Sequence, residues 1–160
     1  KKFITDKYFL MLLPDDLIIK KNCSKSMIQV HKKFKTSVMA SMKVNKSDVS
    51  RWGIYNIKKK IDKNNFIINN VVEKPSIKTS PSNNAVIGRY ILPKTIFSKL
   101  KSLKPGKSGE FHITDAIQAL IEDDHQFIGH NFSGKYLDCG TMKGYIKSTL
   151  EISKQWNFVW

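Results

Sequence analysis

The sequence predicts an α/β fold with a mixed sheet, and three observations lead to this prediction. Short apolar runs of strand length recur along the chain. Stretches with apolar residues at helical spacing separate several of these runs, an alternation typical of a sheet covered by helices. One or two polar turns join neighbouring apolar runs and favour hairpins, so antiparallel strand pairs are expected beside parallel ones.

Up to residue 92 the chain contains most of the expected strands. Phe9 to Leu13 is apolar and is followed by Pro14, which predicts a buried strand and then a loop. Ser24 or Ser26 can cap a helix that continues to about Phe34. The further strands expected here are 37–44, 54–57, 66–72 and 85–92, with a polar turn at 58–65 and a loop at 77–83.

The rest of the chain is expected to be mainly helical. Helices are expected over 94–103, 113–122 and 141–156, strands over 126–132 and 136–138, and a loop at 104–109. The last helix should place four side chains in buried contacts, namely Tyr145, Ile146, Leu150 and Ile152.

Length and composition fit one domain over residues 1–160. A chain of this length can bury a sizeable core. The sequence shows no internal repeat and no sign of a second domain. The opening Lys1 to Asp6 lacks the apolar stretch of a signal peptide, and no apolar run has the length of a membrane span. Cys23 and Cys139 are the only cysteines and stand in no paired motif, which favours a reducing, cytoplasmic location without membrane partners.

The formal net charge of +15 raises the question of nucleic-acid binding. Almost all basic residues are lysines, since Arg51 and Arg89 are the only arginines, and the longest lysine run, 58–60, has no interleaved aromatic residue. Dedicated nucleic-acid sites more often use arginine and stacking aromatics. We therefore expect no nucleic-acid partner and interpret the charge as an attraction for anionic substrates. A non-enzymatic module that binds polyanions is the alternative.

Two acidic segments follow apolar runs. Asp15 and Asp16 come directly after the first expected strand, where open α/β sheets bind ligands, and adjacent carboxylates there suit magnesium. Asp138 ends a short apolar run and is followed by Gly140, which lets the backbone approach a ligand. A solvated turn and a strand-to-helix cap are the ordinary alternatives.

Glu73 and Lys74 end another apolar run. Glutamate accepts hydrogen bonds from hydroxyls, and lysine offers a compact charge for phosphate, so together they suit a sugar phosphate. Adjacent strand residues point to opposite faces, so both can serve one ligand only where the strand ends, and Pro75 provides that end. Gly53 would allow close approach of a sugar ring. Solvated charges and a turn glycine are the alternatives.

The order and spacing of these segments resemble the sugar-1-phosphate nucleotidyltransferases, and among them the bacterial UTP–glucose-1-phosphate uridylyltransferases. The resemblance covers nearly the whole chain and implies a Rossmann-like, glycosyltransferase-A-like fold. It rests on residues 13–18, 48–54, 72–75 and 81–90, on Gly109-Glu110 with Thr114-Asp115-Ala116, and on Asp138-Cys139-Gly140 with Gly144-Tyr145.

The resemblance also implies a reaction. UTP and glucose 1-phosphate would form UDP-glucose and pyrophosphate with Mg²⁺ as cofactor, in an enzyme that forms homo-oligomers. Lys74 and Asp15 would be the catalytic residues. The remaining assignments are Asp15 and Asp138 to the metal, Gly53, Glu73 and Val86 to the glucose pocket, and Lys74 to the sugar phosphate.

One departure from the family pattern is large. Family members begin with a strand and a Gly-x-Gly-Thr-Arg type loop that binds the nucleotide, and this sequence contains no Gly-x-Gly. We therefore expect the carboxyl-terminal, sugar-phosphate part of the domain, with the amino-terminal strands missing and no turnover of UTP by this chain alone. Another sugar-1-phosphate nucleotidyltransferase is the alternative, because the nucleotide loop would decide the base.

Overall fold

The structure is a computed structural model that describes residues 3–103 and 111–156. Its centre is a six-stranded sheet in the order β1-β6-β3-β7-β5-β4. Within it β3 and β7 run parallel, whereas the other described neighbours pair antiparallel, so the expected mixed sheet is confirmed. The strands are β1 (Tyr8–Leu12), β3 (Ser37–Lys43), β4 (Gly53–Lys60), β5 (Asn65–Glu73), β6 (Asn84–Pro93) and β7 (Phe127–Asn131).

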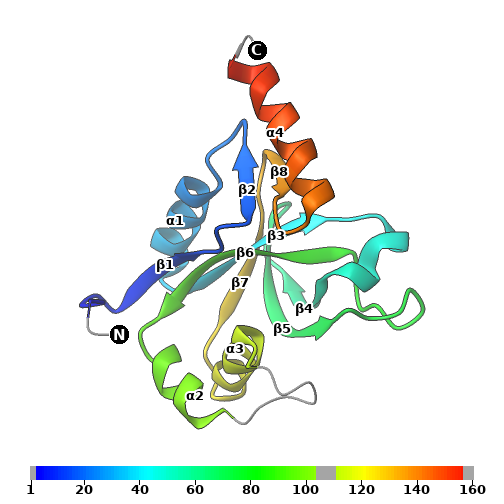
Figure 1. Cartoon of the computed structure of the whole chain (residues 1–160). Helices are drawn as coiled ribbons and strands as arrows, with labels where there is room; N and C mark the ends of the chain where they lie inside the picture. Colours follow the sequence, from blue (N-terminus) through cyan, green and yellow to red (C-terminus); the bar gives the residue numbers. More distant parts are fainter. Residues whose placement is uncertain (1–2, 104–110, 157–160) are drawn as a thin grey trace.

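A second, two-stranded sheet is formed by β2 (Asp16–Ile19) and β8 (Lys135–Asp138), which run antiparallel. Figure 1 shows this pair beside the last helix, at the top of the view and above the middle of the main sheet. The helices are α1 (Cys23–Phe34), the 3-10 helix η1 (Lys46–Arg51), α2 (Ile96–Ser102), α3 (Ile113–Glu122) and α4 (Met142–Trp156).

Helices cover both faces of the main sheet. On one face Met27 of α1 belongs to the same buried cluster as Val38 and Ala40 of β3. On the other face Ile117 of α3 belongs to the same cluster as Met39. Since consecutive strand residues point to opposite faces, β3 contributes to both clusters and the fold has three layers.

Several expected elements are confirmed. The helices expected to end at about Phe34 and to span 113–122 are α1 and α3. A hairpin joins β4 to β5 as expected, but its turn is shorter than 58–65, because β4 continues to Lys60 and β5 begins at Asn65. The apolar run 85–92 lies inside β6, which pairs with β1, β3 and β4. The helix at 94–103 is shorter than expected, and the loop expected at 104–109 lies outside the described residues.

The amino-terminal expectations need three corrections. The first strand is not buried, because β1 is an edge strand and Leu12 is 48% exposed. The cap of α1 is Asn22, whose side chain accepts the amide hydrogen of Lys25, rather than a serine. Residues 16–19 form a strand where a loop was expected, since the short run Leu17-Ile18-Ile19 pairs with β8.

The expected burial of α4 side chains is wrong for three residues. Tyr145, Ile146 and Leu150 are 58%, 52% and 56% exposed, whereas Ile152 is half-buried. The helix rests on β8 through a narrow opposite side, where the buried Ser148 donates a hydrogen bond to the carbonyl of Asp138. No described helix is long and apolar enough to cross a membrane.

A glycine in β7 makes one core contact testable. Gly129 lies opposite Phe66 of β5, and a β carbon at Gly129 would be 2.2 Å from Cε2 of the Phe66 ring. This ring is 3% exposed and packs edge-on against Tyr55, so it has little room to move. We expect Gly129→Ala to lower the free energy of unfolding by about 1–3 kcal/mol, measured by urea denaturation.

A double variant provides the control. Replacing Phe66 with leucine removes the ring edge that the alanine would strike. Gly129→Ala combined with Phe66→Leu should therefore lose less stability than the two single losses together. Strictly additive losses would contradict the proposed contact.

Candidate functional site

Two carboxylates from distant segments converge beside Gly140. Asp138 lies directly opposite Asp16 in the β2–β8 pair, and the amide of Cys139 donates to the carbonyl of Asp15 over 2.8 Å. A β carbon at Gly140 would lie 2.8 Å from Oδ2 of Asp15 and 3.4 Å from Oδ1 of Asp138. The pairing of two short strands therefore brings together the two carboxylates that the sequence analysis assigned to a metal.

The chemistry of this pair fits a hard divalent cation. Carboxylate oxygens suit magnesium, which commonly keeps water and substrate phosphates as its other ligands. The backbone amide of Gly140 also donates to Oδ1 of Asp138 over 2.9 Å, which fixes that carboxylate. No group of three or more His, Cys, Asp or Glu suited to a metal occurs among the described residues, so this pair alone would leave most of the coordination sphere open.

The adjacent Asp16 has a different environment. Its Oδ2 accepts the amide hydrogen of Gly88 over 2.5 Å, and its Oδ1 accepts the phenolic hydrogen of Tyr136. Burial raises the pKa of Tyr136, and the hydrogen bond to Asp16 raises it further, so the phenol remains a donor. Both carboxylate oxygens of Asp16 therefore accept hydrogen bonds from within the chain.

The predicted sugar-phosphate residues cluster where β5 ends. Gly53 lies opposite Glu73 in the β4–β5 pair, and a β carbon at Gly53 would be 3.0 Å from Oε1 of Glu73. The chain then turns at Lys74, whose φ of +44° is left-handed and whose amide donates to the carbonyl of Trp52 over 3.0 Å. Glu73 and Lys74 are both exposed, so the strand end leaves a carboxylate and an ammonium open to a ligand.

Strand β6 adjoins both clusters. Val71, which would contact a side chain at Gly53, packs against the same buried cluster as Val86 of β6. Gly88, two residues further along β6, approaches Asp16, since a β carbon at Gly88 would be 2.4 Å from Oδ2 of that residue. The pairing of β6 with β3 is irregular between these two positions. The sugar-phosphate cluster and the segment that carries the two aspartates thus both lie beside β6.

Tyr90 lies on β6, two residues beyond Gly88. Burial raises the pKa of Tyr90, and the negative charges of Asp16 and Glu73 raise it further. The hydroxyl of Tyr90 is therefore close enough to Asp16 and to Glu73 to interact electrostatically with both.

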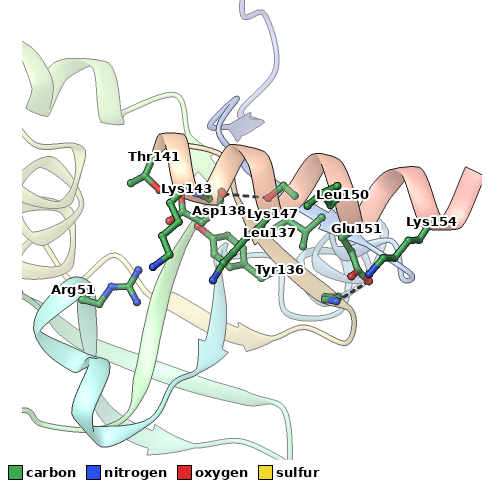
Figure 2. Close-up of a pocket in the computed structure, with 13 residues that line it drawn as sticks. Arg51, Tyr136, Leu137, Asp138, Thr141, Lys143, Lys147, Leu150, Glu151 and Lys154 are labelled. Atoms are coloured by element: carbon green, nitrogen blue, oxygen red, sulfur yellow. Dashed lines mark hydrogen bonds and ion pairs between the residues drawn. The ribbon is translucent and has the colours of Figure 1, made fainter. Parts of the chain in front are cut away.

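A basic groove borders the acidic pair. It has a volume of about 780 Å³, and Tyr136 and Asp138 are among its lining residues. Figure 2 shows Arg51 of η1 and Lys143 and Lys147 of α4 directed into it. Further along, Lys135 pairs with Glu151 at 2.7 Å. Positive charge in a groove attracts anions, so the basic side chains gathered here can draw an anion towards Asp138.

The sequence matches the Nucleotidyl transferase family over residues 1–155. The chain belongs to this family. It is 35% identical over 152 residues to the UTP–glucose-1-phosphate uridylyltransferase of Pseudomonas aeruginosa, covering 93% of this chain and 54% of the relative. It is also 35% identical over 152 residues to UTP–glucose-1-phosphate uridylyltransferase 2 of Staphylococcus saprophyticus, covering 94% and 52%.

Solved structures give the same family fold. An apo UDP-glucose pyrophosphorylase matches with a TM-score of 0.89 and 36% identity, over 96% of this chain and 57% of the other. A UDP-glucose pyrophosphorylase complexed with UDP-glucose matches with a TM-score of 0.88 and 35% identity, over 96% and 59%. The predicted family and its mixed α/β nucleotidyltransferase fold are confirmed. The chain spans about half the length of the relatives that it matches.

Sequence reasoning missed two residues beside the aspartates of the candidate site. Tyr136 was placed in a strand without a role, yet its hydroxyl holds Asp16. Gly88 was one glycine in an apolar run, although a glycine inside a strand often marks close approach of another group. That approach is made by Asp16 and Leu13.

The glycines of the site provide a matched pair of substitutions. A β carbon at Gly53 would be 3.0 Å from Oε1 of the exposed Glu73, which can swing away, and 3.1 Å from Cγ1 of the half-buried Val71, which would have to move by only a few tenths of an ångström. A β carbon at Gly88 would be 2.5 Å from Leu13 and even closer to the hydrogen-bonded Asp16. In urea denaturation we expect Gly53→Ala to change stability by about 1 kcal/mol or less and Gly88→Ala to lose about 1–3 kcal/mol. Equal losses would contradict this difference.

Proposed function

We propose that this chain is the sugar-phosphate-binding part of a UTP–glucose-1-phosphate uridylyltransferase, which forms UDP-glucose and pyrophosphate from UTP and glucose 1-phosphate. The observation that carries the proposal is the exposed strand end at Glu73 and Lys74, set against Gly53. The names of the relatives support the choice of nucleotide and sugar.

Each pocket residue would recognise a different part of glucose 1-phosphate. Glu73 would accept hydrogen bonds from sugar hydroxyls, and Lys74 would meet the phosphate. The absence of a side chain at Gly53 would let the sugar ring approach the backbone, and Val86 would form an apolar wall. Adjacent residues within a strand point to opposite faces of the sheet. Because Lys74 lies at a turn, its side chain need not point away from that of Glu73.

Asp15 and Asp138 would hold the metal, which we propose to be Mg²⁺. When bound, a divalent cation supplies neutralisation of phosphate charge. The chain's own contribution is the fixed pair of carboxylates, positioned by the β2–β8 pairing and by the amide of Gly140.

The reaction needs positioning more than covalent chemistry. A phosphate oxygen of glucose 1-phosphate would attack the α-phosphorus of UTP in line, forming one P–O bond as the bond to pyrophosphate breaks. Lys74 would orient the attacking phosphate and offset its repulsion from the nucleotide. The basic groove beside Asp138 would raise the local concentration of both anionic substrates.

Three further features remain predictions within this proposal. We expect homo-oligomers in the intact enzyme and no nucleic-acid partner. We also expect a cytoplasmic location, which agrees with the free thiols of Cys23 and Cys139.

Binding of glucose 1-phosphate tests the sugar-phosphate assignment. In calorimetric titrations with magnesium present, we expect saturable binding by the wild-type chain. Lys74→Ala should weaken binding by about ten- to a hundredfold through loss of a charged contact, with unchanged thermal unfolding. Lys78→Ala, which removes an exposed lysine from the next loop, is the control and should bind like wild type. Equal affinities for the two variants would show that Lys74 has no such role.

Metal binding tests the acidic pair. Mn²⁺ has an electron paramagnetic resonance signal that reports its binding, and it suits the same oxygen ligands as magnesium. We expect Asp138→Asn and Asp15→Asn each to weaken Mn²⁺ binding by about tenfold or more. Asp6→Asn, at an exposed carboxylate, is the control. Unchanged binding in both site variants would remove the metal assignment.

A further inference from the structure

The side chain of Asp16 joins three strands at one point. Its carboxylate, on β2, accepts hydrogen bonds from the amide of Gly88 on β6 and from the hydroxyl of Tyr136 on β8. Its backbone carbonyl accepts a hydrogen bond from Nη2 of Arg89 over 3.1 Å. Within the described part of the chain, both side-chain hydrogen bonds that connect the small sheet to β6 involve this residue.

The contact with β6 is unusually close and depends on glycine. A β carbon at Gly88 would overlap Oδ2 of Asp16 at 2.4 Å and Leu13 at 2.5 Å. The amide of Leu13 also donates to the carbonyl of Gly88 over 2.8 Å. The segment carrying the aspartates therefore sits directly on the backbone of the central strand.

The position of Asp16 determines where its neighbours lie. Asp15 precedes it in the chain, and Asp138 is its partner across the β2–β8 pair. On β6, Gly88 is two residues from Val86 of the proposed glucose pocket. A shift of Asp16 relative to Gly88 would thus move both proposed metal carboxylates relative to the sugar.

We propose that Asp16 is a positioning residue that sets the distance between the acidic pair and the sugar-phosphate pocket, and that it does so by hydrogen bonding rather than as a metal ligand. The inference rests on the proposed function, because it concerns the geometry of that site. It assigns to the second aspartate of the Asp15-Asp16 pair a role distinct from that of the first.

Asparagine separates the two possible roles of this side chain. The carbonyl oxygen of an Asn side chain can accept the Gly88 amide hydrogen, and its NH₂ group can donate to the Tyr136 oxygen. Asp16→Asn therefore keeps both contacts and removes the charge, whereas Asp16→Ala removes both contacts. A positioning role tolerates the first change but not the second.

The experiment measures Mn²⁺ binding by electron paramagnetic resonance, below the unfolding temperature of every variant. We expect Asp16→Ala to weaken binding by about tenfold or more and Asp16→Asn to stay within about threefold of wild type. Tyr136→Phe, which removes one of the two hydrogen bonds, should fall between them. Equal losses in the Ala and Asn variants would show that the charge acts directly, and unchanged binding in both would show that Asp16 positions nothing.

Amide hydrogen exchange gives a readout that does not need the metal. Exchange in residues 16–19 and 135–138 should accelerate in Asp16→Ala and remain near wild type in Asp16→Asn. If the wild-type chain bound no Mn²⁺, the metal assignment of the proposed function would fail, and exchange would still decide the positioning role. Exchange rates in Asp16→Ala equal to those of wild type would overturn the positioning role of Asp16.

Discussion

The antiparallel pairing of β2 with β8 is the constraint on which the site depends. Each strand has only four residues, and each comes from a different end of the chain. Their pairing sets Asp16 against Asp138, and the partly buried hydrogen bonds of Asp16 hold the pair on β6. Because polar groups withdrawn from water are costly when unpaired, this network favours one arrangement of the small sheet over others.

Much of the fold could be predicted because local and global signals agree. Helix α3 carries its apolar residues at regular spacing, and it begins and ends where this pattern does. Strand β6 could be predicted from its continuous apolar run, which is typical of a strand covered on both faces. Strand β2 was missed because three apolar residues after a Pro-Asp-Asp turn carry no signal of a distant partner. The exposed apolar side of α4 was predicted to be buried because periodicity shows that a helix has an apolar face, not that the described chain covers it.

The residues of the candidate site were nominated from motifs. Of Asp15, Gly53, Glu73, Lys74, Val86 and Asp138, the structure brings Asp15 close to Asp138 and sets Gly53 opposite Glu73. The residue pattern alone could not assign different roles to Asp15 and Asp16, because the two side chains are identical and differ only in their surroundings. Only the family resemblance singled out Asp15. Likewise, nothing in the sequence near Tyr136 or Gly88 points to a residue that lies far away along the chain and close in space.

The two thiols of the chain differ in a way that has a practical consequence. Cys23 is the buried first residue of α1, and burial raises its pKa to about 11, so it stays protonated and unreactive at neutral pH. Cys139 is half-buried, and its amide is bonded to Asp15 between the two acidic segments. A thiol-directed fluorophore or spin label would therefore attach selectively beside the acidic pair, so the natural sequence already carries a reporter position for ligand-induced change at this site.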